Sequence, residues 1–363
     1  MSTRILERPT ATLPAKRTKP SGAATVGAVV LAAVAIGPLL LGDFASFVGA
    51  RIAVTAIIGL SVIVVTGYTG QLSLMPYTFV GIGMFVAAHA ITGWGWPFWF
   101  AAMLAAALSV PLSLLVGLVA VRLHGFYFAI ATLTFASAVG ATLFEWDAFT
   151  GGQTGMRVAR PVIGPINFAG DEAYYLLCLV TVLLLVWMVI GLQHSRIGRA
   201  MTAVRENETA AATLGINVMK TKLVAFIVSG MIAAIGGVYH GMLLQSVTPT
   251  PYQTPYVEAV GVTLVILVVI GGMRSPWGPF IGAAIMYVQV EVFRTALFLQ
   301  YIAAAMTAIA FIVVLLKLPD GLVGLIKHEA EVVRRAPLRG SIRVATIIAI
   351  KVVVTYAIWR LSQ

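Results

Sequence analysis

Residues 196–226 read RIGRAMTAVRENETAAATLGINVMKTKLVAF and hold seven charged side chains, whereas the chain on either side is almost entirely apolar. This contrast indicates a chain that crosses a membrane and carries a loop outside the lipid. Within the stretch, VRENETAAATLG (204–215) predicts a short helix, because alanine and glutamate are good helix formers. Gly215 is placed to end that helix in the left-handed conformation. So ordered a polar segment indicates a surface that a partner contacts; a solvated loop without a partner is the alternative.

The composition of the whole chain points the same way. Of its 363 residues, 60% are hydrophobic and 10% are charged, whereas a soluble domain has about 25% charged residues. Residues 52–121, 223–257 and 295–316 contain no Asp, Glu, Lys or Arg. Each of these segments is long enough for at least one crossing, which needs about 20 apolar residues. A soluble core of this size would still need charged helix faces toward water.

Ten apolar runs follow one another along the chain. Backbone polar groups in lipid must pair within the protein, so these runs predict helices, and they lack the alternation of a barrel wall. We therefore expect an all-α polytopic membrane protein, a bundle of eight to ten transmembrane helices. The runs lie at 22–41, 51–67, 76–92, 98–121, 124–144, 174–193, 222–245, 259–272, 279–298 and 300–318.

The distribution of basic residues predicts the orientation of this bundle. The formal net charge is +11, and Lys and Arg gather in the first 20 residues, in the stretch 196–226 and from Lys317 to Arg343. Because Lys and Arg accumulate in cytoplasmic loops, we expect these parts inside the cell and residues 145–173 outside it. The charge does not indicate a nucleic-acid partner, since no aromatic residues are interleaved with it.

These expectations divide the chain into three parts. They are a basic cytoplasmic tail at 1–21, a transmembrane domain at 22–328 with a cytoplasmic loop at 195–222 and an extracytoplasmic loop at 145–173, and a cytoplasmic tail at 329–363. Residues 341–363 either lie at the membrane surface or form an extra span.

Two predicted helices end early, each before a segment rich in Gly and Pro: GYTGQLSLMP (67–76) and GGMRSPWGP (271–279). Irregular backbone is tolerated at membrane depth where it lines a cavity, so paired breaks indicate a translocation path. Close helix packing is the alternative reading of the glycines. Tyr127 and Thr134 share a helix face, whereas Thr132 lies off it and reads as a packing residue. The candidate path residues are Tyr68, Gly70, Gln71, Ser73, Tyr127, Thr134, Gly271 and Gly272.

Several blocks of the sequence carry a family resemblance. The stretch 196–226, GYTGQLSLMPYTFVGIG, HGFYFAIATLTFA, TGGQTGM, GGMRSPWGPFIGA and LPDGLVGLI occur in one order over about residues 45–328. Together they resemble the branched-chain amino acid permease family of ABC importers, and within it the subunit that pairs with a second, homologous permease.

The resemblance implies a multi-pass protein of the bacterial inner (plasma) membrane with a cytoplasmic N-terminus. It implies a second permease, two ABC ATPases and an external solute-binding protein as partners. ATP and Mg would bind the ATPases, so this chain is expected to be no enzyme and to hold no cofactor or metal. The solute would be a branched-chain or related hydrophobic amino acid; urea, short amides and other small solutes are alternatives within the family.

The resemblance also implies that residues 195–222 couple the permease to an ATPase. The candidate coupling residues are Arg199, Arg205, Glu206, Asn207, Glu208, Ala211, Gly215, Ile216 and Asn217. The general importer pattern has Glu-Ala-Ala with glycine six residues after the glutamate, whereas Glu208 precedes Gly215 by seven. Which side chain of Arg205, Glu206, Asn207 and Glu208 contacts the ATPase therefore stays open.

The loop at 145–173 is the candidate docking site for the binding protein. Its candidates are Glu145, Asp147, Gly151, Gly152 and Arg157, with Arg160 also available; a solvated loop is the alternative. TGGQ (150–153) is similar to an ATPase signature, but the sequence has no Gly-Lys dipeptide and so no phosphate-binding loop.

Two other classes of protein compete with this interpretation. An ion-coupled secondary transporter would need an acid or histidine within the membrane, for which Glu258, Glu291 and His89 are candidates near the ends of spans. An enzyme would need a catalytic cluster, but His89, His124 and His240 lack metal-ligand spacing. No charge is expected inside the central spans, which favours a passage that leaves recognition to a binding protein.

Overall fold

The computed structural model describes residues 42–120, 122–123, 125–163, 166–253, 256–292, 312 and 321–324. The expected tails at 1–21 and 329–363 and the run at 22–41 lie outside the described residues, as does the run at 300–318 except for residue 312.

Eight of the ten predicted runs form helices in the described part of the chain. Within it, six helical spans are long and apolar enough to cross a membrane, and two apolar helices are shorter. The predicted class, an all-α polytopic membrane protein, is confirmed. The spans are α2 (Asp43–Val62) continued by the π-helical η1 (Ile63–Gly67), α3 (Pro76–Ala87) continued by η2 (Ala88–Gly93), α4 (Phe98–Ala120), α5 (Phe126–Thr142), α7 (Asp171–His194) and α10 (Val218–Leu244), and the shorter helices are α11 (Tyr256–Gly271) and α12 (Gly278–Val292).

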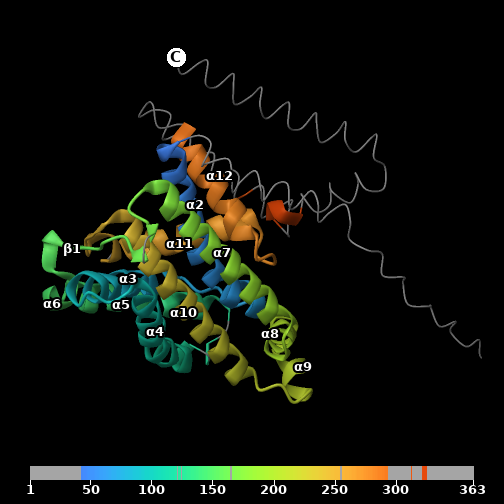
Figure 1. Cartoon of the computed structure of the whole chain (residues 1–363). Helices are drawn as coiled ribbons and strands as arrows, with labels where there is room; N and C mark the ends of the chain where they lie inside the picture. The colour runs from blue at the N-terminus through green and yellow to red at the C-terminus, as the bar shows by residue number, and fades with distance from the viewer. Residues whose placement is uncertain are drawn as a thin grey trace, which may run out of the picture.

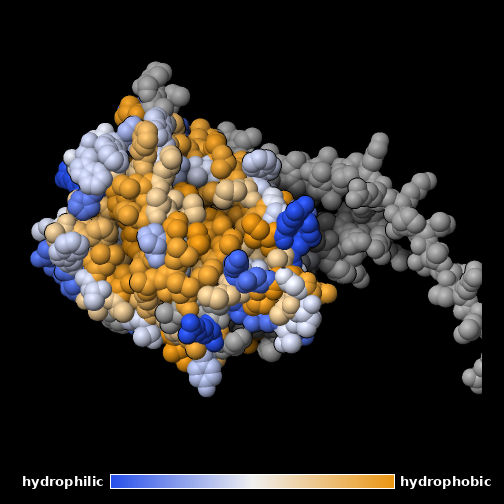
Figure 2. Space-filling view, turned by 90° about the horizontal axis from the view of Figure 1, so that it is seen from below, coloured by the Kyte–Doolittle hydropathy of each residue, from blue (hydrophilic) through white to orange (hydrophobic). Residues whose placement is uncertain are grey.

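Helices α2, α3 and α10 form the centre of the described bundle. Helix α10 packs against α2, α3 and α4, while α2 also packs against α7 and α12. The outer helices α4, α5 and α7 expose large apolar side chains, among them Phe100, Met103 and Trp187. Figure 2 shows apolar side chains over much of one face of the molecule. Such a surface suits contact with lipid.

Glycines allow the central helices to touch. A Cβ atom on Gly83 of α3 would overlap the carbonyl of Ala234, and one on Gly237 of α10 would overlap the carbonyl of Val80. The backbones of α3 and α10 therefore lie in direct contact, as small residues permit in membrane bundles.

The two ends of the bundle differ. One end carries the polar helices α8 (Arg196–Glu206) and α9 (Glu208–Thr213), seen at the lower right of Figure 1, and we call it the coupling end. The other end carries residues 143–170, and we call it the loop end. There η3 (Leu143–Glu145), α6 (Asp147–Thr150) and η4 (Gly152–Thr154) precede three short strands.

The strands of the loop end form two antiparallel pairs. Strand β1 (Met156–Arg157) pairs with β4 (Ser246–Val247), with Met156 opposite Val247. Strand β2 (Val162–Ile163) pairs with β3 (Ile166–Asn167). The β1–β4 pair ties the loop to the segment that follows α10. From β4 the chain continues through η5 (Thr250–Tyr252) into α11.

The expectation that no charge lies inside a central span was wrong for α2. This helix begins at Asp43, two turns before the predicted start at residue 51, so Arg51 lies within it and not at its end. The Arg51 guanidinium carbon lies 4.7 Å from the centre of the Tyr287 ring and 5.9 Å from that of Phe47. The rings stabilise the cation through cation–π contact, which sequence hydropathy does not register.

Candidate functional site

The polar segment at the coupling end forms two helices. One short helix over 204–215 was predicted, but α8 ends at Glu206 and α9 begins at Glu208. The break has a local cause, because the side chain of Asn207 accepts a 2.9 Å hydrogen bond from the backbone N–H of Ala210. Asn207 thus caps the start of α9 and leaves the backbone extended at its own position. Ser195 caps α8 in the same way.

The predicted left-handed end at Gly215 is confirmed. Gly215 has φ +82°, its N–H donates to the Ala212 carbonyl (3.0 Å), and the Ile216 N–H donates to the Ala211 carbonyl (3.1 Å). These two bonds form a Schellman motif, which closes the last turn of α9. The turn leads directly to Asn217, whose side chain caps α10 by accepting from the Lys220 N–H. Three side-chain caps and one left-handed glycine therefore fix the shape of the segment.

A buried ion pair joins α9 to α10. The ammonium of Lys222 lies 2.7 Å from the carboxylate of Glu208, and the Lys222 side chain is 1% exposed against 35% for Glu208. A buried cation is costly without a close counter-charge. Glu208 was predicted as a coupling residue but Lys222 was not, because nothing in the local sequence pattern shows that the lysine side chain turns inward.

A second polar contact joins α8 to the first break. The guanidinium of Arg205 donates a hydrogen bond to the carbonyl of Gly67, where η1 ends. The Arg205 side chain also lies along Gly70, whose φ of +73° a side chain would rarely adopt. Helix ends leave carbonyls without intrahelical partners, and arginine supplies a charged donor here. Candidate coupling and path residues therefore meet at this corner, although the sequence placed them more than a hundred residues apart.

The first break, residues 68–75, runs into the bundle between α5 and α11. The backbone N–H of Leu74 donates to the Thr132 hydroxyl on α5 (3.2 Å), and a Cβ atom on Gly261 of α11 would lie 2.5 Å from the Leu74 carbonyl oxygen. Thr132 is buried, as expected of a packing residue. It also holds the irregular backbone of the break, a role that its position on the helix did not predict.

The side chains of the first break are mostly buried. Tyr68 and Ser73 are buried, Gly70 is exposed, and the buried Gln71 Oε1 has no hydrogen-bond partner among the described residues. The Tyr68 hydroxyl donates a long hydrogen bond (3.5 Å) to Gln193 of α7.

The second break, residues 272–277, contacts the first. A Cβ atom on Gly67 would overlap the carbonyl of Met273, and one on Gly271 would overlap that of Gly278. Gly271 and Gly272 are both buried, and Gly272 has φ +127°. Close backbone contact therefore accounts for the glycines, and it brings the two breaks together at the coupling end of α2.

The remaining candidates lie at the surface or near it. On α5, Tyr127 (72% exposed) and Thr134 share the exposed face. On the coupling segment, Glu206, Asn207, Gly215 and Asn217 are exposed, Arg205, Glu208 and Ile216 are half-buried and Ala211 is buried. Arg199 is exposed and donates to the His194 carbonyl at the end of α7 (2.7 Å).

The candidate docking residues lie at the loop end. Glu145, Asp147, Gly151 and Arg157 are exposed and Gly152 is half-buried. Gly151 and Gly152 both have positive φ, which shapes the turn between α6 and β1.

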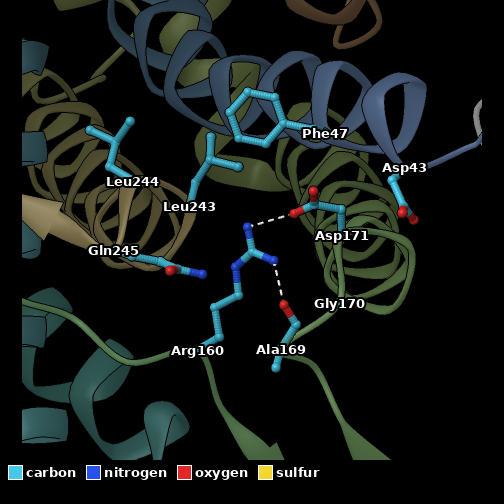
Figure 3. A pocket seen from close by; sticks show the side chains of 9 residues that line it. All are labelled: Asp43, Phe47, Arg160, Ala169, Gly170, Asp171, Leu243, Leu244 and Gln245. Carbon is cyan, nitrogen blue, oxygen red and sulfur yellow. Dashed lines mark hydrogen bonds and ion pairs between the residues drawn. The ribbon is translucent and has the colours of Figure 1, made fainter.

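Arg160 was expected to be available to a docking partner, and this was wrong. Its side chain is 7% exposed and lies 2.7 Å from the Asp171 carboxylate. It also donates to the Ala169 carbonyl (2.7 Å) and lies over the Tyr174 ring. Figure 3 shows the guanidinium pointing into a cavity of about 510 Å³ between the ends of α2, α7 and α10. Arg160 therefore fastens the loop to the start of α7.

The bundle, its broken helices and its polar coupling end define a polytopic membrane protein. A family model described as the permease component of branched-chain amino acid transport systems matches residues 44–317. The chain belongs to this family, whose members are transport permeases.

Relatives agree with this membership. The high-affinity branched-chain amino acid transport system permease protein LivM of Salmonella typhimurium is 29% identical over 262 residues, which are 66% of this chain and 61% of the relative. LivM of Escherichia coli K12 is 28% identical over the same shares. The probable branched-chain amino acid transport permease protein LivH of Methanocaldococcus jannaschii is 32% identical over 157 residues, 40% of this chain and 46% of that protein. The chain thus spans about three fifths of the length of the LivM relatives. No solved structure matches.

Proposed function

We propose that this chain is a permease subunit of an ATP-driven importer of the bacterial inner membrane, with its N-terminus in the cytoplasm. It pairs with a second, homologous permease and passes branched-chain amino acids that an external solute-binding protein delivers. Two separate ATPases bind and hydrolyse ATP with Mg²⁺. The family and the names of the relatives support the solute class.

The contacts that tie α8 and α9 to the bundle at the coupling end, which we call the coupling joint, are the observation that carries this proposal. Helix α9 is short, capped at both ends and exposed along Thr209, Ala210, Ala212 and Leu214. It is tied to α10 by the Lys222–Glu208 pair, and α8 is tied to the first break by Arg205. An ATPase that moves this exposed surface would move α10 and the break with it.

The path follows from the two breaks. The first break lies where α2, α5 and α11 meet, and the second break contacts Gly67, which directly precedes the first. Irregular backbone is tolerated in membranes where it is buried in protein or lines a passage. Movement of the break against α5 and α11 would switch access between the two sides. The loop end, with Glu145, Asp147 and Arg157 exposed, is the surface that we assign to the binding protein.

Reconstitution tests the proposal. The chain is affinity-purified from its native membrane, the accompanying subunits are identified, and the whole complex is placed in vesicles with the binding protein that accompanies it. We expect a P-loop ATPase and a second permease to co-purify, and labelled leucine to enter the vesicles when ATP is present on the ATPase side. Leucine uptake by the purified chain alone, driven by an ion gradient, would contradict the proposal and support a secondary transporter.

One variant separates docking from folding. Leu214 is 79% exposed, so Leu214→Asp should leave the fold intact but weaken recovery of the ATPase. Thr202→Asp, which places the same charge at an exposed position of α8, is the matched control. Equal loss of the ATPase from both variants would remove the assignment of α9 as the docking helix.

A further inference from the structure

Glu258 is an acidic residue that the coupling joint and the docking loop do not use. It lies in the first turn of α11 and is half-buried. The hydroxyl of Ser137 on α5 donates a hydrogen bond to its carboxylate. Among the residues that the structure describes, no Lys or Arg forms an ion pair with it. Ionised side chains within membrane bundles are costly and usually face the interior or a water-filled cavity.

The start of a helix offers only a partial explanation for this acid. An acidic side chain in the first turn is stabilised by the helix dipole, and Asp171 and Glu172 occupy such positions on α7. Glu258 differs because its carboxylate turns sideways to Ser137, which lies five residues before the end of α5. It is therefore placed along the α5–α11 contact.

The α5–α11 contact is also where the first break enters the bundle. Thr132 of α5 holds the N–H of Leu74, and Gly261 of α11 lies against the Leu74 carbonyl. Glu258 lies one helical turn from Gly261, toward the loop end. Glu258 thus lies one turn beyond the helix position that contacts the break, on the side from which a solute would arrive.

The exposed surface beside Glu258 combines small or weakly polar side chains with a few large ones, since Val262 and Tyr256 of α11 and Ile130 of α5 are also exposed. Thr134, Ala138 and Ala141 of α5 and Ala259 of α11 are exposed. By contrast, the exposed faces of α4 and α7 carry Leu, Phe, Met and Trp. Small side chains beside a carboxylate leave room for a solute, whereas the bulky apolar faces suit lipid.

We propose that Glu258, oriented by Ser137, binds the ammonium group of an amino acid in the passage. This inference rests on the proposed function and narrows its solute class. A carboxylate that forms no ion pair with a described Lys or Arg attracts the ammonium that all amino acids carry. It offers no such attraction to uncharged solutes such as urea and amides, so the site favours amino acids over them.

Reconstituted vesicles that hold the whole complex and its binding protein test this role. In Glu258→Gln we expect ATP hydrolysis stimulated by the loaded binding protein to persist, while leucine uptake per ATP falls about tenfold or more, since a hydrogen bond between charged groups contributes at least about one factor of ten. Glu258→Asp should retain more uptake than Glu258→Gln. Ser137→Ala, which keeps the charge, should lower uptake by a factor of about two or three. Glu172→Gln, an exposed first-turn acid of α7, is the matched control and should transport like wild type.

Three results would count against the inference. Wild-type uptake by Glu258→Gln would exclude a role in the passage. Loss of the second permease from Glu258→Gln preparations, with Glu258→Asp intact, would assign the carboxylate to a subunit contact instead. A fall in Glu172→Gln equal to that in Glu258→Gln would show an effect of surface charge. Absence of ATP-dependent uptake in the wild-type complex would be a different outcome, because it removes the proposed function itself.

Discussion

Lys222 carries a positive charge at a position where its side chain is almost hidden from solvent. Its carboxylate partner, Glu208, is about one-third exposed, so water weakens the pair from that side. Removing the carboxylate leaves a buried cation without its counter-charge, whereas removing the lysine also removes the cost of burying it. The two halves of this pair should therefore respond differently to substitution.

We expect Glu208→Gln to lower the free energy of unfolding by about 1–3 kcal/mol and Lys222→Met to lower it less. Thermal unfolding of the purified chain in detergent measures both. Glu206→Gln is the control, since Glu206 is exposed in the same segment. If Glu208→Gln and Glu206→Gln unfolded at the same temperature, the ion pair would contribute nothing to the stability of the fold.

The backbone conformation at position 215 requires glycine, whereas the space around it does not. Apart from its chain neighbours and nearby helix backbone, no atom of the described residues lies within 4 Å of the position where its Cβ would be, but its φ is +82°. Gly215→Ala should therefore destabilise the chain by about 1–2 kcal/mol through backbone strain. Gly191→Ala in α7 has equal space and no positive φ, so it should stabilise by up to about 1 kcal/mol. Opposite shifts in the unfolding temperature are the expected result, and shifts of one sign would contradict it.

Among the helices, the features that could be predicted from the sequence are those that depend on neighbouring residues alone. Apolar runs gave the described helices because a crossing needs a minimum length of apolar chain, and Gly215 gave the end of α9. The start of α2 was missed, since Tyr287, which holds the closer of the two rings that stabilise Arg51, is brought near it only by folding. The contacts of the candidate site, Arg205 with Gly67 and Leu74 with Thr132, join distant segments. Local pattern carries no information about such pairs.

The contact between α3 and α10 gives a sharp test of packing. A Cβ atom on Gly237 would overlap the Val80 carbonyl, but one on Gly241, a turn further along α10, would make ordinary contacts of 3.5–3.7 Å. Gly237→Ala should destabilise the chain by about 1–3 kcal/mol through overpacking, while Gly241→Ala should have little effect. Comparable unfolding temperatures for the two variants would mean that the helices separate easily at this point.

At the scale of the whole molecule, the proposed coupling depends on Arg205 joining α8 to the first break. Replacing it by alanine should leave the ATPases docked and active, yet lower the leucine transported per ATP, because the break would no longer follow α8. Arg199→Ala is the matched control, because it removes an arginine of the same helix whose side chain donates to the end of α7. Leucine uptake and ATP hydrolysis are measured together in vesicles. An equal fall in leucine transported per ATP for both variants would argue against a specific role of Arg205 in joining α8 to the first break.

Helix α10 reaches both ends of the bundle. Its 27 residues span about 40 Å at 1.5 Å per residue, with Lys222 fixed to α9 at one end and β4, paired with β1, directly beyond the other. Under the proposed function, one stiff rod therefore touches the surfaces for both partners. Binding energies linked through a common body must be reciprocal. Whatever factor nucleotide applies to the affinity for the binding protein, the binding protein must apply to the affinity for nucleotide.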